Sequence, residues 1–167
     1  MRRNVAWLSL LSALALGSVA HADPRELVGA PAPEIRARPL EGEAEVELSQ
    51  YRGRVVVLAF FATWCGACRR MAPELETIRR THRASGLEVI GLSHEPRELL
   101  RRHAALVPSE YPVVQCTGRT ARRYHATGLP TIVLVGRDGV VRAAYQGAAP
   151  DVVRRLRRDV DHAVAAR

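Results

Sequence analysis

Two cysteines separated by two residues, Cys65 and Cys68, are the side chains of this sequence best suited to chemistry. They lie in the stretch FFATWCGACRRMAP, residues 60–73. A C-x-x-C pair can hold haem, ligate zinc, close a structural loop or exchange electrons through a reversible disulfide. Each of these uses requires different neighbouring residues.

Three of the four uses fit the neighbouring residues poorly. Haem attachment needs a histidine directly after the second cysteine, and position 69 is arginine. A structural zinc site needs four ligands, and the only other cysteine is the isolated Cys116. A purely structural disulfide would close too short a loop to stabilise the fold much. A redox dithiol without metal or cofactor is what remains, and Cys116 is expected to be a small buried residue, with a second redox partner as the alternative.

The position of the pair predicts different roles for its members. Cys65 follows the apolar run 55–61 and begins a predicted helix, so its sulfur should meet free backbone N–H groups and the positive end of the helix dipole. Arg69 and Arg70 add positive charge one turn later, and such surroundings lower a cysteine pKa. Cys68 is close enough to attack a mixed disulfide at Cys65. We therefore predict that Cys65 is the nucleophile and Cys68 the resolving cysteine.

The hydropathy pattern predicts the elements that position this pair. Strands are expected at residues 35–40, 45–48, 55–61, 87–92, 131–135 and 140–145. Helices are expected at 65–82 with a break or bend at Pro73, at 96–106, at 120–125, and along a final apolar stripe formed by Val152, Val153, Leu156, Val160 and Val164. Strands and helices alternate along the chain, which predicts an α/β fold with a central mixed sheet and helices on both faces.

The first and last predicted strand pairs are hairpins. The first forms an N-terminal extension that turns at Glu41-Gly42, and the lead-in at residues 28–39 should cross the domain surface. The second turns at residues 136–139, whose Asp-Gly pair is a strong hairpin signal.

The first 22 residues predict export. Arg2 and Arg3 precede an apolar run from Val5 to Leu16 and a small-residue site, Ala20-His21-Ala22, which together are typical of a cleaved signal peptide. The run is shorter than the roughly 20 residues that span a bilayer, although an uncleaved anchor is the alternative. Cleavage would leave one domain, residues 23–167, in the periplasm or another exported location.

Charge gives no indication of a nucleic-acid partner. The formal net charge is +8, but arginines are scattered over the predicted helix faces with Glu and Asp among them. This arrangement is typical of a solvated surface.

Two distant segments together resemble thioredoxins. WCGACRRMAPEL resembles the thioredoxin active-site segment, with Trp64 before the cysteine pair and Pro73 after it. GLPTIVLV, residues 128–135, is similar to the cis-proline strand of that family. The resemblance implies a thioredoxin-like fold with a cis Leu129-Pro130 bond beside the dithiol. It also implies that Trp64, Leu129 and Pro130 bind an extended substrate segment.

The flanking sequence indicates a branch of that superfamily. VGAPAPEIRARPLEGEAEVELSQYRGRVVVLAFFATWC resembles the entry of the TlpA, ResA and CcmG-like extracytoplasmic thioredoxins, and so does a central helical insertion between Leu92 and Gly128. This resemblance implies a monomeric exported thiol-disulfide oxidoreductase that reduces secreted proteins or apocytochromes and receives electrons from a membrane donor.

Other functions stay open at this point. A periplasmic disulfide oxidase or isomerase is the main alternative. A peroxiredoxin-type peroxidase would carry a T-x-x-C motif, whereas Thr63 is only two positions before Cys65. A non-catalytic binding module on the same fold is a further alternative, because a fold alone does not prove activity.

Three positions depart from the thioredoxin pattern. Ala59 stands where many thioredoxins bury an acid, and Met71 where the cytochrome c maturation branch often carries a glutamate. Ala67 stands between the cysteines where thioredoxins usually have proline. Glu74 and His94 are the candidates to carry protons in place of the missing acid.

Overall fold

A computed structural model describes residues 22–42 and 44–166. The predicted signal peptide, residues 1–22, lies outside the described residues except for Ala22. Within the described ranges, no helix combines the length and apolar character needed to cross a membrane.

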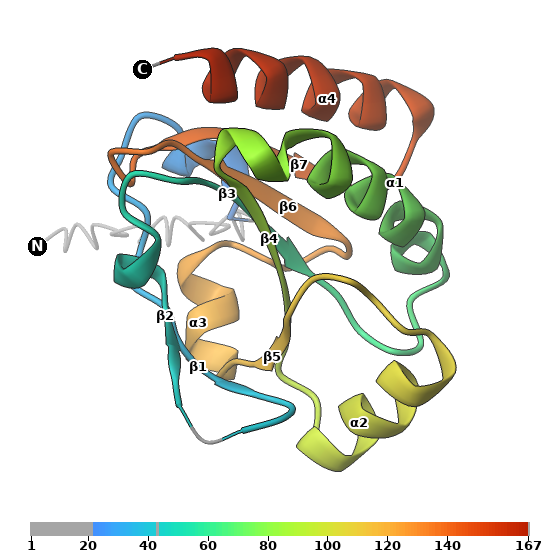
Figure 1. The fold of residues 1–167 in the computed structure, drawn as a ribbon. Coiled ribbons are helices and arrows are strands. Elements are labelled where there is room, and N and C mark those ends of the chain that lie inside the picture. Colours follow the sequence, from blue (N-terminus) through green and yellow to red (C-terminus); the bar gives the residue numbers. More distant parts are fainter. Residues whose placement is uncertain (1–21, 43, 167) are drawn as a thin grey trace, which may run out of the picture.

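The chain forms a mixed sheet with helices on both faces, which confirms the predicted α/β architecture (Figure 1). The strands are β1 (Arg36–Pro39), β2 (Val46–Glu47), β3 (Val55–Phe60), β4 (Leu87–Ser93), β5 (Val113–Gln115), β6 (Thr131–Val135) and β7 (Val141–Gln146). The α-helices are α1 (Gly66–His82), α2 (Arg97–Leu106), α3 (Gly118–Arg123) and α4 (Pro150–Ala165). Short 3-10 helices are η1 (Pro24–Leu27), η2 (Leu48–Tyr51) and η3 (Arg83–Ser85).

The seven described strands lie in the order β2-β1-β5-β4-β3-β6-β7. Strand β4 pairs in parallel with β3 and β5, and the other pairs are antiparallel. Both predicted hairpins, β1–β2 and β6–β7, are confirmed. The lead-in also behaves as predicted, because Pro31 bridges to Val140 beside β7.

Strand β3 explains why both faces of the sheet need helices. Val55, Val57 and Ala59 point into one hydrophobic core, whereas Val56, Leu58 and Phe60 point into the other. Side chains alternate along a strand, so an unbroken apolar run buries both of its faces. Helices α1 and α4 cover the first face, and α3 covers the second with Ala121, together with Tyr124 directly after the helix. The strand therefore ends, and the cysteine pair begins, at a firmly held point of the fold.

Two predictions between β4 and β6 need correction. The helix expected at residues 120–125 is α3, Gly118–Arg123, because the Thr117 side chain accepts the N–H of Thr120 and starts the helix earlier. His125 adopts a φ of 51°, which a helix does not contain, so the helix has ended before it. Residues 113–115, for which no strand was predicted, form the sheet strand β5.

The predicted central insertion is helix α2, which Figure 1 shows apart from the other three helices. Its Leu100 is buried, and two of its arginines reach back to the N-terminal hairpin. Arg97 Nη2 and Arg101 Nε each donate to the carbonyl of Leu40, both at 3.0 Å. These contacts hold the insertion against the sheet and fix the space between α1 and α2.

Candidate redox site

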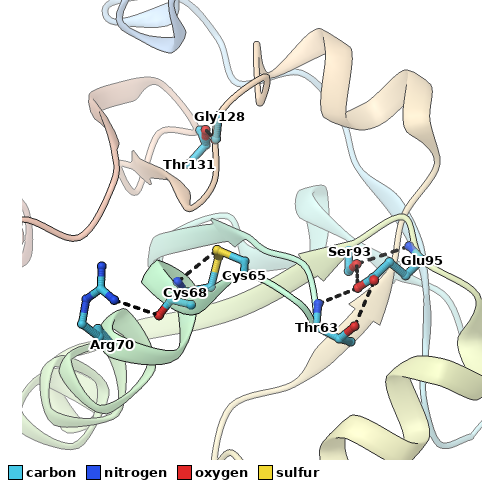
Figure 2. Close-up of a disulfide and its surroundings, with 9 residues drawn as sticks. Thr63, Cys65, Cys68, Arg70, Ser93, Glu95, Gly128 and Thr131 are labelled. Carbon is cyan, nitrogen blue, oxygen red and sulfur yellow. Dashed lines mark hydrogen bonds between the residues drawn. A yellow bond between two sulfur atoms is a disulfide. The ribbon is translucent and has the colours of Figure 1, made fainter.

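Cys65 and Cys68 form a disulfide in the turn from β3 to α1 (Figure 2). Cys65 is the N-cap residue of α1, and its Sγ accepts the backbone N–H of Cys68 at 3.1 Å. Its carbonyl accepts the N–H of Arg69 at 3.2 Å, which begins the helical pattern. The Cys65 sulfur therefore lies at the positive end of the helix dipole, the location expected from the sequence.

Positive side chains lie along the first turn of α1. Arg69 and Arg70 are both exposed, and Arg70 Nη1 donates to the carbonyl of Gly66 at 3.4 Å. Their charges add to the helix dipole, so both favour a thiolate over a neutral thiol at the helix start.

The disulfide is buried, whereas the tryptophan that precedes it is exposed. The side chains of Cys65 and Cys68 are only 5% and 7% exposed, whereas Trp64 is 73% exposed. An indole that leaves most of its surface in water contributes little to the core. Its position next to the cysteine suits a contact with another molecule.

The segment opposite the disulfide has the predicted backbone. The Leu129-Pro130 peptide is cis, and Thr131 Oγ1 donates to the carbonyl of Gly128 at 2.6 Å, which closes the turn (Figure 2). Leu129 is half-buried and packs against the cluster that contains both cysteines. Pro130 is buried.

Two cavities flank the disulfide, one on the side of each sulfur. The Cys65 hollow has a volume of about 290 Å³. Its lining includes Trp64, Cys65, His94, Cys116, Thr127 and Leu129. The predicted binding residues Trp64 and Leu129 thus lie together beside the predicted nucleophile.

The Cys68 groove is larger, at about 420 Å³. Helix α1 contributes one wall, and α2 with the segment after it contributes the other. Its lining includes Ala59, Cys68, Met71, Leu100, Tyr111 and Pro130. Pro130 therefore borders the groove, whereas Leu129 borders the hollow, so the cis peptide separates the two cavities.

Two of the three departures from the thioredoxin pattern meet in this groove. Ala59 and Met71 both line it and supply no acid next to Cys68. Glu74, one proposed replacement, lines neither cavity and pairs with Arg157 of α4. His94 does lie in the Cys65 hollow, where it is exposed.

Sequence reasoning missed the acid that lines the groove, Glu76. Its Oε1 accepts the N–H of Glu110 at 2.6 Å, whereas its Oε2 is buried without a hydrogen-bond partner in the described part of the chain. Glu76 follows Cys68 by eight residues, about 12 Å along the helix, too far for direct contact with the sulfur. It supplies a hydrogen-bond acceptor at the far end of the groove.

Cys116 is free and buried, as the sequence predicted. Burial raises the pKa of its thiol to about 11, so it is neutral at physiological pH. Among the described residues, no three His, Cys, Asp or Glu side chains are grouped to hold a metal ion.

The fold and the position of the cysteine pair define a class, the thiol-disulfide oxidoreductases of thioredoxin-like fold. A family model described as the AhpC/TSA family matches residues 28–144. The chain belongs to this family.

Named relatives agree with this class. "Thiol-disulfide oxidoreductase ResA" of Geobacillus kaustophilus is 29% identical over 133 residues, which are 77% of this chain and 76% of that protein. A solved structure from Chlorobium tepidum, titled as a thiol:disulfide interchange protein DsbE, is 30% identical with a TM-score of 0.78. The match covers 83% of this chain and 98% of that chain. A Bacteroides thetaiotaomicron structure titled as a protein disulfide isomerase is 25% identical with a TM-score of 0.74, over 82% of this chain and 89% of that one.

Proposed function

We propose that this protein is an exported disulfide reductase in which Cys65 attacks the client and Cys68 completes the exchange. One observation carries the proposal: Cys65 caps α1 and its sulfur accepts a backbone N–H, whereas Cys68 lies a turn inside the helix. The capped sulfur is the one whose thiolate the helix stabilises, and the thiolate is the attacking species.

The reaction consists of two thiol-disulfide exchanges. The Cys65 thiolate attacks one sulfur of the client disulfide, which forms a mixed disulfide and releases the other client sulfur as a thiolate. The Cys68 thiol then loses its proton and attacks the Cys65 sulfur. This step forms the Cys65–Cys68 disulfide and releases the second client thiolate. Two electrons pass to the client, and both client thiolates take up protons.

The surroundings of the disulfide support a protein client rather than a small molecule alone. In the hollow beside Cys65, Trp64 offers an exposed aromatic face and Leu129 offers an apolar side chain. Together with Pro130, they would hold an extended client segment across the disulfide.

Location and partners follow from the same proposal. The signal-like residues 1–22 would direct the domain 23–167 to the periplasm or an equivalent compartment. Such compartments are oxidising, so the pair would stay a disulfide unless an electron donor reduced it. A membrane protein is the expected donor, and secreted proteins or apocytochromes are the expected clients of the monomeric enzyme.

Trapping with single cysteine variants tests this proposal. Cys68→Ser should accumulate covalent adducts with client proteins in exported material, because the resolving thiol is missing. Cys65→Ser is the matched control and should trap almost nothing. The attached chains, identified after purification, would distinguish apocytochromes from general secreted clients. Equal trapping by both variants, or trapping by neither, would contradict the assigned roles.

A further inference from the structure

A carboxylate outside the C-x-x-C motif holds the turn that carries Cys65. Glu95 lies two residues after the end of β4, and its side chain points at Thr63 (Figure 2). One carboxylate oxygen accepts the Thr63 N–H at 2.7 Å, and the other accepts the Thr63 hydroxyl at 3.0 Å. Ser93 Oγ donates to the same carboxylate at 3.3 Å. Three donors therefore converge on one side chain.

Thr63 is the middle of the turn that joins β3 to α1. Before it, the Phe61 N–H donates to the carbonyl of Leu92 at 2.9 Å, and after it the Cys65 N–H donates to the carbonyl of Ala62 at 3.1 Å. The Glu95 contacts lie between these two attachments, only two residues before the N-cap cysteine. A change in the Thr63 backbone would therefore be transmitted to Cys65.

Glu95 is itself fixed by the sheet. Its carbonyl accepts a hydrogen bond from Gln115 Nε2 at 2.9 Å, and its N–H donates to Ser93 Oγ at 3.3 Å. Ser93 is 2% exposed and pairs with Gln115 across β4 and β5. Because the backbone carbonyl and N–H of Glu95 are both hydrogen-bonded, the carboxylate of Glu95 can hold Thr63 in place.

We propose that Glu95 is a positioning residue that holds Cys65 in its N-cap geometry through Thr63. The inference rests on the proposed role of Cys65 as nucleophile. A carboxylate suits this task because it only accepts hydrogen bonds and can receive several donors at once. Hydrogen bonds to an ionised acceptor are also roughly twice as strong as those between neutral groups.

Charge and position predict opposite effects on Cys65. A negative charge near a thiol disfavours the thiolate. If Glu95 acted through its charge alone, removal of its carboxylate would lower the Cys65 pKa and speed attack. If Glu95 acts by positioning, removal of its carboxylate loosens the N-cap geometry of Cys65, which raises the Cys65 pKa and slows attack. The sign of the change therefore identifies the role.

The experiment measures alkylation of the reduced protein by iodoacetamide as a function of pH. In Glu95→Ala we expect attack slower by about tenfold, equivalent to about 1.4 kcal/mol, with the midpoint of the pH profile raised. Thr63→Val removes only the hydroxyl donor and should show a smaller change of the same sign. Thr63→Ser keeps both donors and should react like the parent protein. Glu98→Ala, which removes an exposed carboxylate on α2 paired with Arg102, is the matched control and should change nothing.

A double variant sharpens the test. Because Glu95 and Thr63 act through one contact, the Glu95→Ala/Thr63→Val pair should be no slower than Glu95→Ala alone. Additive losses, an unchanged profile, or a lowered midpoint in Glu95→Ala would each overturn the proposal. If Glu95→Ala does not fold, the comparison of Thr63→Val with Thr63→Ser decides, and equal rates in these two would overturn it.

If the proposed function is wrong, the alkylation experiment gives a different result from the one expected if only the Glu95 proposal is wrong. If Cys65 is not the nucleophile, the parent protein will be alkylated at another cysteine, and Cys65→Ser will keep the reactive thiol. If only the Glu95 proposal is wrong, Cys65 will react normally in the parent and in every Glu95 and Thr63 variant.

Discussion

The two cavities beside the disulfide differ in size and lining, in line with the different roles that we propose for the two sulfurs. The Cys65 hollow is lined by the exposed indole of Trp64 and by His94. The sulfur of Cys65 accepts a backbone N–H. The Cys68 groove is larger, and most of the residues that line it are apolar. In the described part of the chain, no group donates a hydrogen bond to Cys68 Sγ.

This difference supports the different steps that we propose for the two cysteines. Hydrogen bonding and the helix dipole stabilise a thiolate at Cys65, whereas an apolar setting favours the neutral thiol at Cys68. In the proposed reaction, the Cys65 sulfur is therefore ready to attack, and Cys68 must lose a proton before it can. Substitutions on one side of the disulfide at a time test this proposed division.

The largest effect is expected from a new acid in the Cys68 groove, Met71→Glu. Met71 is 1% exposed, lies three residues after Cys68 and lines the same groove. A general base there should accelerate release of the mixed disulfide on the order of 100-fold, which stopped-flow measurements would detect. Burial of a carboxyl without a partner should cost about 2–4 kcal/mol of stability.

The stability loss in Met71→Glu should depend on pH in a defined direction. Burial raises the pKa of the introduced carboxyl above its unfolded value of about 4.3, so the folded state binds more protons. Stability should therefore fall as pH rises above about 4.3, and it should level off above the folded pKa. Met71→Leu, which keeps the volume and adds no acid, should show neither effect. An unchanged release rate in Met71→Glu at every pH would mean that proton loss from Cys68 is not limiting.

A smaller effect is expected from Trp64→Ala, which changes the Cys65 side of the disulfide. Because the indole is 73% exposed, its removal should change stability by less than about 0.5 kcal/mol. Truncation of an aromatic contact residue typically costs about 2 kcal/mol of binding, so KM for a protein disulfide should rise roughly 30-fold. The rate with a small disulfide reagent should stay the same. Leu106→Ala, at an 83% exposed apolar residue outside both cavities, is the control. A loss that is equal for large and small substrates would remove Trp64 from client binding.

The smallest effect on the exchange reaction is expected from Cys116, which lines the Cys65 hollow. Its folded pKa of about 11 exceeds the unfolded value of about 8.5, so the folded state binds the proton more tightly between these pH values. Stability should fall there by at most about 1.4 kcal/mol per pH unit, and Cys116→Ala should remove this slope. The comparison is made in the Cys65→Ser/Cys68→Ser background, which prevents disulfide exchange. An unchanged slope would mean that Cys116 is not the titrating group.

The sequence was sufficient where chemistry and periodicity are local. The unbroken run of β3 predicted a central strand, and the apolar stripe of α4 predicted its buried face, which contains Val152, Leu156 and Val160. The C-x-x-C spacing and the strand-to-helix boundary placed Cys65 at the helix start, where the structure has it.

The sequence was insufficient where a contact joins distant residues. Thr63 and Glu95 are separated by 32 positions, and Glu76 and Glu110 by 34, so neither pair forms a motif. The sequence offered Glu74 and His94 as replacement proton carriers but not Glu76, because the groove that Glu76 lines is formed by segments far apart in the sequence. Strand β5 has three residues, which is too short for a periodic signal.

The central claim is that Cys65 is the stabilised thiolate, and ultraviolet absorbance of the reduced protein against pH tests it most directly. In Cys68→Ser, where Cys116 titrates only near pH 11, the first absorbance step belongs to Cys65. The account predicts a midpoint below about 7.5, within the range for cysteines at helix N-termini. A midpoint near about 8.5, the value of a free thiol, would contradict it.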